Sequence, residues 1–183
     1  MEPSLRLFFA LDVPEEIRQD LDKFSVTLEK PWRPVKPERM HITLAFMGEV
    51  SVDRFAEVVS IGDAAASACS SFEVSISDTA CFPETGEPSV LYATVDGGAQ
   101  LAGLAEFLRS RLGDLADQKK FRAHLTLARC RGGWARKVLR KFRGSWKVND
   151  FCLIKSSFQE DGAKYELIRQ FALRPPDAGN RDK

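Results

Sequence analysis

The sequence predicts an α+β fold built from two related halves. Strand-like and helix-like segments are mixed along the chain, with hairpins as well as crossovers, which is typical of α+β proteins. The phrase "RMHITLAF" (Arg39–Phe46) returns as "RAHLTLAR" (Arg122–Arg129), with five of eight positions identical. Each copy follows a strand, a helix and an irregular connection. This placement indicates two lobes of similar design.

In the first half we expect two strands and two helices. A strand at Leu5–Val13 precedes a helix at Pro14–Glu29, which Asp12 would cap together with Glu15 in a capping box. After a Pro-broken connection, a strand begins at His41 and ends at Gly48. Ser51 would then cap a helix at Val52–Ala68.

The second half repeats the mixture of strands and helices. Strands are expected at residues 72–78, 90–95, 121–130, 150–158 and 164–173, and helices at residues 100–112 and, within a basic segment, 134–142. We expect one bilobal domain over residues 1–175, followed by a polar, disordered tail at residues 176–183.

The composition is that of an ordinary soluble protein, with 183 residues, 44% hydrophobic, 29% charged and a net charge of +1. The charge is unevenly distributed, because Lys119–Lys147 contains eleven Lys or Arg residues and no Asp or Glu. This stretch is either a solvated helix face or a surface that attracts phosphates.

None of the four cysteines forms a C-x-x-C pair, and no histidine accompanies them at metal-ligand spacing. We therefore expect no metal and no cofactor. The N-terminal apolar run is too short for a signal peptide, and no stretch has membrane-spanning length. These features predict a reduced, cytoplasmic protein that does not enter membranes.

Both histidines of the chain lie in the repeated phrases, 83 residues apart. Side chains alternate across a strand, so His41 and Thr43 share one face, as do His124 and Thr126, while the leucines face a core. A single H-x-T can be structural, with the histidine bonded to a neighbour. Its double occurrence, with no other histidine in the chain, favours a functional pair.

Two histidines at one cleft suit acid–base chemistry, because one imidazole can remove a proton while the other donates one near neutral pH. Threonine hydroxyls can donate to non-bridging phosphate oxygens, so the pattern fits displacement at phosphorus without a metal. Arg129 could bind the phosphate through its guanidinium fork. Strict alternation, however, places Arg129 on the leucine face, and it joins the site only if the strand twists or ends there.

The paired H-x-T motifs resemble those of the 2H phosphoesterase superfamily, and within it the family of RNA 2',3'-cyclic phosphodiesterases, historically called 2'-5' RNA ligases. The likeness extends over nearly the whole chain. Besides the two motifs, it includes the opening strand "LRLFFALDVP", the Phe-Pro loop "CFPETGEPSVLY" and the closing hairpin "LIKSSFQEDGAKYELIRQFAL". Ala123 departs from the pattern, since the family often has Pro before the second histidine.

The resemblance implies two pseudo-symmetric lobes, each an antiparallel sheet flanked by helices, with the active site in the groove between them. It implies His41 and His124 as catalytic residues, and Thr43, Thr126 and Arg129 as phosphate-binding residues. Phe82, in the Phe-Pro loop, becomes a candidate for stacking on a base, although packing would explain it equally.

The implied activity is metal-independent hydrolysis of RNA 2',3'-cyclic phosphate ends to a 2'-phosphate, by a monomer whose partners are RNA ends or oligonucleotides. The family suggests His41 as the acid and His124 as the base, roles that sequence symmetry alone leaves open. Two alternatives remain. One is a related 2H enzyme acting on 2'-5'-linked oligonucleotides or small cyclic phosphates, and the other is an RNA-end-binding module with little turnover.

Overall fold

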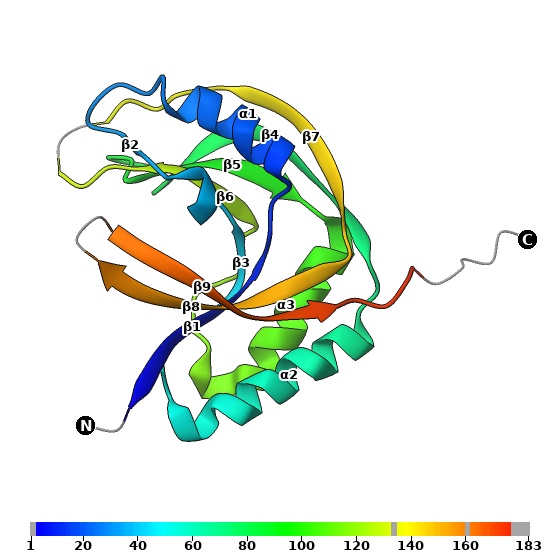
Figure 1. Cartoon of the computed structure of the whole chain (residues 1–183). Coiled ribbons are helices and arrows are strands. Elements are labelled where there is room, and N and C mark those ends of the chain that lie inside the picture. The colour runs from blue at the N-terminus through cyan, green and yellow to red at the C-terminus, as the bar shows by residue number, and fades with distance from the viewer. Residues whose placement is uncertain (1–2, 133–134, 160–161, 177–183) are drawn as a thin grey trace, which may run out of the picture.

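The computed structural model describes residues 3–132, 135–159 and 162–176, which form two antiparallel sheets and three α-helices (Figure 1). One sheet has the strand order β3-β1-β8-β9 and the other the order β2-β6-β5-β4-β7. The strands are β1 (Ser4–Leu11), β2 (Arg33–Pro34), β3 (Ile42–Ser51), β4 (Phe72–Phe82), β5 (Val90–Asp96), β6 (His124–Arg129), β7 (Lys141–Val148), β8 (Asp150–Gln159) and β9 (Gly162–Ala172), and the helices are α1 (Glu15–Ser25), α2 (Phe55–Ala68) and α3 (Gly98–Leu112). The predicted α+β class with two antiparallel sheets is confirmed.

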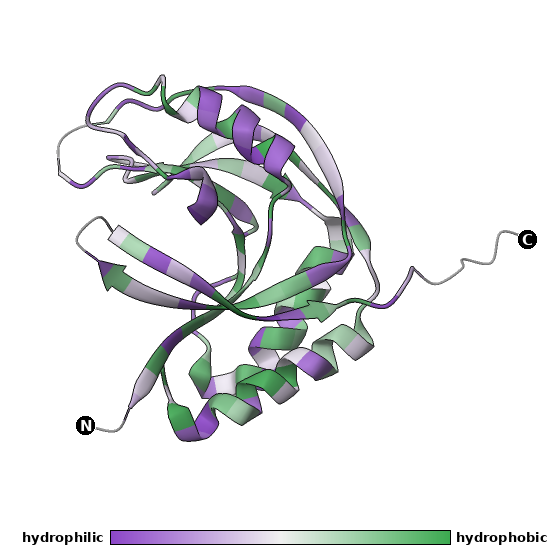
Figure 2. Cartoon of the chain, in the orientation of Figure 1, coloured by the Kyte–Doolittle hydropathy of each residue, from purple (hydrophilic) through white to green (hydrophobic). Residues whose placement is uncertain are grey.

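The helices α1 and α3 each link or pack against both sheets. α1 follows β1 of the four-stranded sheet, leads into β2 of the five-stranded sheet and contacts β6 of that second sheet. α3 joins β5 to β6 of the five-stranded sheet, yet it packs against β3 and α2 (Figure 1). One large apolar cluster accordingly includes buried residues of both sheets, such as Phe9 and Leu125. Apolar residues gather where the helices meet the sheets (Figure 2).

Two glycines permit close packing between helices and sheets. A Cβ on Gly62 of α2 would lie 2.5 Å from the Phe171 ring, and one on Gly144 of β7 would lie 2.7 Å from Ile17 of α1. Gly62 lowers helix propensity, but a larger residue there would push α2 away from β9.

The predicted helix at residues 134–142 is wrong where it can be judged. Residues 135–140 are irregular, and Lys141 begins strand β7, while Trp134 lies outside the described residues. The reason is that burial alternates from residue to residue within this basic segment. Phe142, Gly144 and Trp146 are partly buried, and the residues between them are exposed. A period of two is a strand pattern.

Both predicted helix caps are also wrong. α1 begins at Glu15 after Pro14, without a side-chain cap, because the Asp12 carboxylate pairs with Arg18 instead. The Ser51 hydroxyl bonds the Asp53 carboxylate, and a short 3-10 turn at Val52–Arg54 precedes α2.

The strand β3 does not end at Gly48 as predicted. Gly48, with φ of +73°, sits at a β-bulge, and β3 continues to Ser51. Most of the expected tail, residues 177–183, lies outside the described residues. In the described parts of the chain, no helix is long and apolar enough to cross a membrane.

Candidate active site

The two histidine strands belong to different sheets and face one groove of about 700 Å³. His41 and Thr43 line it from the β3 side, and His124 and Thr126 line it from β6. The residues between and beside them, Ile42, Leu44, Leu125 and Leu127, are buried, as the alternation predicted. The structure therefore brings together both copies of the repeated phrase. The groove is lined by Arg6, Phe8, Arg33, Pro34, Val35, Lys36, Arg39, His41, Thr43, Phe46, His124, Thr126, Arg129, Arg131, Ser156, Phe158, Gln159, Gly162, Ala163 and Tyr165.

The two imidazole rings are held in the same way. His41 Nδ1 lies 2.8 Å from the carbonyl oxygen of Arg39, and His124 Nδ1 lies 2.7 Å from that of Arg122. A carbonyl oxygen only accepts, so Nδ1 carries the proton in both rings. Each Nε2 is then left to exchange a proton, accepting one when the ring is neutral and donating one when it is charged.

Matching β-bulges explain how Arg129 reaches the groove. In β6, Tyr92 pairs with Thr126 and Leu91 with Ala128, which leaves Leu127 as an extra residue. In β3, the register places Leu44 in the same role. A one-residue slip reverses the faces of the residues that follow it. The fifth residue after each histidine therefore lines the groove, as Phe46 in one lobe and Arg129 in the other.

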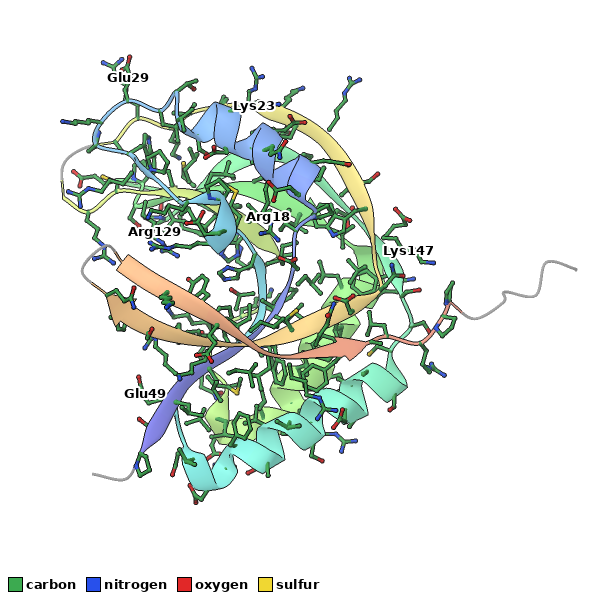
Figure 3. All side chains as sticks on the ribbon, viewed as in Figure 1. Arg18, Lys23, Glu29, Glu49, Arg129 and Lys147 are labelled. Atoms are coloured by element: carbon green, nitrogen blue, oxygen red, sulfur yellow. The ribbon has the colours of Figure 1, made fainter. Side chains whose placement is uncertain are left out.

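The groove is strongly cationic. Six of its lining residues are Arg or Lys, and none of the described lining residues is Asp or Glu. Figure 3 shows Arg129 on the side of its sheet that faces β8 and β9. An anionic group would be attracted to this surface and held between the lobes.

Burial and positive charge lower the pKa of both histidines. Burial lowers the pKa of His41 to about 4, and the nearby His124, Arg129 and Arg18 add to this effect, while the hydrogen bond to Arg39 opposes it. Burial likewise lowers the pKa of His124, assisted by Arg129 and Arg122. A bound anion would act in the opposite direction and favour the imidazolium forms.

Each histidine lies beside a phenylalanine and a tyrosine that also contact each other. The His41 ring centroid is 4.9 Å from that of Phe8 and 5.2 Å from that of Tyr165, and both of these aromatics line the groove. The His124 ring is 5.2 Å from Phe82 and 5.5 Å from Tyr92.

Phe82 itself is not among the residues that line the groove. Its ring stacks on Tyr92 at 4.2 Å, and the Arg122 guanidinium lies over it at 4.9 Å. Both contacts occupy the π-faces of Phe82 that a base would need. Base stacking by Phe82 stays a prediction.

Sequence reasoning missed Phe158 and Arg6. Phe158, near the end of β8, is 74% exposed at the groove, and the Arg6 guanidinium lies 5.1 Å from its ring and 4.8 Å from that of Phe46. Phe158 lies in "SSFQEDGA", which by itself indicates only a hairpin end. An exposed aromatic just before such a turn was the available signal.

Acidic, cysteine and histidine side chains do not gather into a possible metal site anywhere in the described residues. Among the described residues, the cysteines form no disulfide: Cys81, Cys130 and Cys152 are buried, and Cys69 is partly buried. None of them lines the groove.

A family model described as LigT-like phosphoesterase matches residues 11–92, a range that includes His41 and Thr43 but ends before His124. The chain is 30% identical to the RNA 2',3'-cyclic phosphodiesterase of Thermus thermophilus over 93% of its own length and 91% of the relative. It is also 30% identical to that of Archaeoglobus fulgidus, covering 91% of this chain and 99% of the relative.

Solved structures show the same similarity in three dimensions. The crystal structure of a Thermus thermophilus protein superposes with a TM-score of 0.86 at 29% identity, covering 93% of this chain and 99% of the other. The Escherichia coli LigT structure in complex with 3'-AMP gives a TM-score of 0.79 at 28% identity, with the same coverage. Together with the two facing H-x-T strands, these matches establish that the chain belongs to the LigT-like phosphoesterase family of the 2H superfamily, whose members are hydrolytic enzymes.

Proposed function

We propose that this enzyme hydrolyses 2',3'-cyclic phosphates at RNA ends and leaves a 2'-phosphate. The observation that carries the proposal is the pair of imidazoles with fixed tautomers, facing one cationic groove that contains no described carboxylate. The names of the curated relatives and the 3'-AMP complex of Escherichia coli LigT support this substrate class. DNA is excluded as a source of the substrate, because it lacks the 2'-hydroxyl that closes the ring.

The reaction uses both histidines in one displacement. His124 Nε2 accepts a proton from water as the water oxygen attacks phosphorus, and the bond between phosphorus and O3' breaks. His41, protonated at Nε2 in the substrate complex, donates its proton to O3'. The products are a 2'-phosphate and a free 3'-hydroxyl, and solvent restores the two protonation states.

The charge that builds up on phosphorus is met by groups along the groove. Thr43 and Thr126 donate hydrogen bonds to the non-bridging oxygens, and Arg129 supplies a positive charge that can reach two of them. The Arg6 guanidinium lies over one face of the exposed Phe158 ring, and the terminal base can stack on the other face. The bound phosphate raises the pKa of both imidazoles and so permits one of them to be charged near neutral pH.

The test is product analysis on a panel of a 2',3'-cyclic-phosphate dinucleotide, a 2'-5'-linked dinucleotide and a small cyclic nucleotide. Rapid conversion of the first to the 2'-phosphate, with slower or no conversion of the others, supports the proposal. A preference for another substrate would assign the groove to a different reaction of the superfamily. Binding without turnover of any substrate would make the protein an RNA-end-binding module.

A further inference from the structure

A basic surface lies outside the groove, on the segment that leads from β6 into β7. We call it the β7 surface and define it by Arg136, Lys137, Arg140, Lys141 and Arg143, all of which are exposed. Lys141 and Arg143 belong to β7, an edge strand of the five-stranded sheet, and the other three precede it. Arg140, Lys141 and Arg143 form no ion pair with any carboxylate in the described parts of the chain.

The backbone that carries these side chains is fixed. Trp32 Nε1 donates to the carbonyl of Arg136 at 3.0 Å. The buried Thr79 hydroxyl donates to the carbonyl of Val138 at 2.6 Å and accepts from the Arg140 amide at 2.8 Å. The irregular segment is therefore held against the sheet at both ends, and its cations lie at defined positions.

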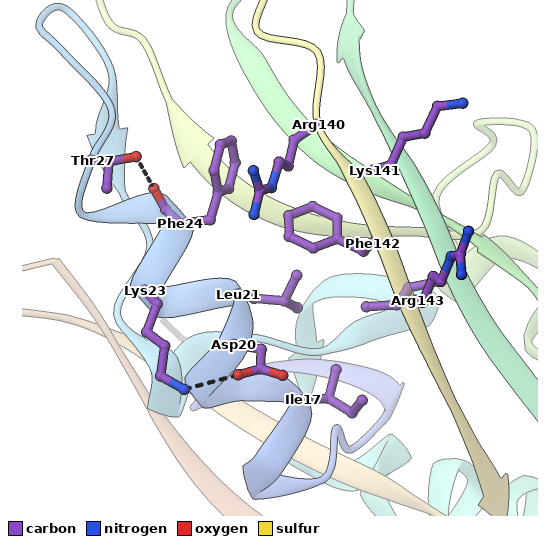
Figure 4. Close-up of a pocket in the computed structure, with 11 residues that line it drawn as sticks. Ile17, Asp20, Leu21, Lys23, Phe24, Thr27, Arg140, Lys141, Phe142 and Arg143 are labelled. Carbon is purple, nitrogen blue, oxygen red and sulfur yellow. Dashed lines mark hydrogen bonds and ion pairs between the residues drawn. The ribbon is translucent and has the colours of Figure 1, made fainter.

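A cavity of about 380 Å³ opens beside this surface, between α1 and β7 (Figure 4). Its walls include Phe24 and Phe142, whose ring centroids are 5.4 Å apart in an edge-to-face arrangement. Arg140 points toward these two rings, and Lys141 and Arg143 follow along β7 (Figure 4). Lys23 pairs with Asp20, the one carboxylate among the described lining residues, so the aromatic walls beside Arg140, Lys141 and Arg143 suit a base and its phosphate better than an apolar ligand.

β7 lies at the opposite edge of the five-stranded sheet from β2, so an RNA would pass from the groove by way of Arg136 to reach the rest of the β7 surface. Arg33 and Arg131 line the groove, and Trp32, the neighbour of Arg33, is the residue bonded to Arg136. Alternate residues of a strand are about 6.8 Å apart, a spacing comparable with that of successive phosphates in an extended single strand. Lys141 and Arg143 have this relationship along β7.

We propose that the β7 surface and the α1–β7 cavity bind the phosphate backbone of single-stranded RNA whose cyclic-phosphate end lies in the groove. The proposal rests on the function proposed above and adds a second contact, which only substrates longer than a dinucleotide reach. The competing explanation is a charged edge strand that prevents sheet-to-sheet association. That role would not distinguish long from short substrates.

The experiment compares a cyclic-phosphate dinucleotide with a single-stranded RNA of about twelve nucleotides bearing the same end, a length within the range of single-strand binding sites. The test variant is Arg140→Gln/Arg143→Gln. Arg111→Gln/Lys164→Gln is the matched control, because it removes the same charge from exposed positions on α3 and β9. We expect the test variant to raise KM for the longer RNA five- to twentyfold, while its kcat and the kinetics of the dinucleotide stay unchanged. The control should change neither substrate.

Salt dependence tests the same idea in the unmodified protein, so a folding defect of the variant cannot obscure the result. Each phosphate contact on a single strand adds about −0.7 to the slope of log affinity against log salt. The wild-type slope should be steeper for the longer RNA, and the double variant should lose about 1.4 of it. Equal slopes for both substrates, or equal effects of the test and control variants, would overturn the proposal. Failure to turn over the dinucleotide would instead count against the proposed function. The salt dependence of RNA binding would still test the contact with the β7 surface in that case.

Discussion

The strands β3 and β6 present the same local structure in different surroundings. Each places a histidine with Nδ1 bonded to a carbonyl two residues before it, a threonine on the same face and a bulge at the next leucine. They differ in what stands five residues after the histidine, Phe46 against Arg129, and in the aromatics beside the ring. Those of His41 line the groove, and those of His124 do not.

This difference teaches how a symmetric pair of lobes can bind an asymmetric substrate. The repeated parts hold two proton-transfer groups in matching orientations, and the parts that differ give the groove a direction. Aromatic rings line the groove near His41, as Phe8, Phe46 and Tyr165, whereas cations lie on both sides, with Arg6 over Phe46 and with Arg129 and Arg131 following β6. A nucleotide has the same polarity, with a base at one end and phosphate at the other.

The strongest test removes each imidazole in turn. We expect His41→Ala and His124→Ala each to lower kcat by about 10²–10⁴, because general acid and general base catalysis each contribute on that scale. The double variant should be far less than additive, since the two groups act in one step. Turnover of the cyclic-phosphate dinucleotide measures this, with circular dichroism as the folding control. A single variant that keeps near-full activity would contradict a shared role.

The proton roles can be separated with a substrate whose bridging 3'-oxygen is replaced by sulfur. A thiolate leaves without a proton, so loss of the acid should matter little. We expect this substrate to restore most of the activity of His41→Ala and little of that of His124→Ala. Restoration of His124→Ala alone would exchange the two roles. The low pKa of His41 in the free protein makes this outcome worth testing, because a lowered pKa makes the charged form of the acid harder to reach.

Replacing the residue five positions after each histidine should have different effects in the two lobes. Arg129→Gln should lower kcat by about 10², as loss of a charge-stabilising donor does, whereas Phe46→Leu should mainly raise KM. Arg129 also lowers the pKa of both histidines, so Arg129→Gln should shift both titrations upward in NMR spectra. Equal kinetic effects of the two substitutions would contradict the direction assigned to the groove.

The pH dependence should also report the surroundings of the two rings. Because the pKa of each histidine is lowered in the free protein, the bell for kcat/KM should be centred below about pH 6.5. The bell for kcat should lie at higher pH, since the bound phosphate raises the pKa of both histidines. The two apparent pKa values of the bell describe the coupled pair of histidines and not either residue alone. A rate that climbs steadily from pH 5 to 10 would remove the base from the mechanism.

The smallest expected effect concerns stability. The pKa of His41 is near 4 in the folded protein and about 6.5 in the unfolded chain. Its titration therefore leaves the free energy of unfolding unchanged above pH 6.5 and lowers it as pH falls toward 4. Relative to His41→Gln, the free energy of unfolding of the wild type should fall by about 2 kcal/mol between pH 7.5 and pH 5. Urea unfolding at both pH values measures this, with His124→Gln as a comparison. A constant difference would show that His41 is not shifted.

The sequence was most informative where a repeated pattern met a strict period. Alternation in "HITLA" and "HLTLA" predicted which side chains share a face, and the structure brings these side chains to one groove. The bulges at Leu44 and Leu127 could not be read from residue types, because a bulge depends on the pairing of two strands. The position of Arg129 was uncertain for that reason, and only the family resemblance favoured it. β7 was missed because charged residues masked the inward alternation of Phe142 and Trp146.

The distribution of strands between the two sheets bears on how the chain could be divided. Cutting it after Asp96 would divide both sheets, because β1 and β3 would be separated from β8 and β9, and β2, β4 and β5 from β6 and β7. The halves that look like two copies in sequence are therefore not two foldable units. Expressed separately, they should be insoluble or unfolded, and co-expressed they should assemble into one active molecule. The two halves of the chain are thus interlocked in the way that the subunits of a domain-swapped dimer are, because each half supplies strands to both sheets.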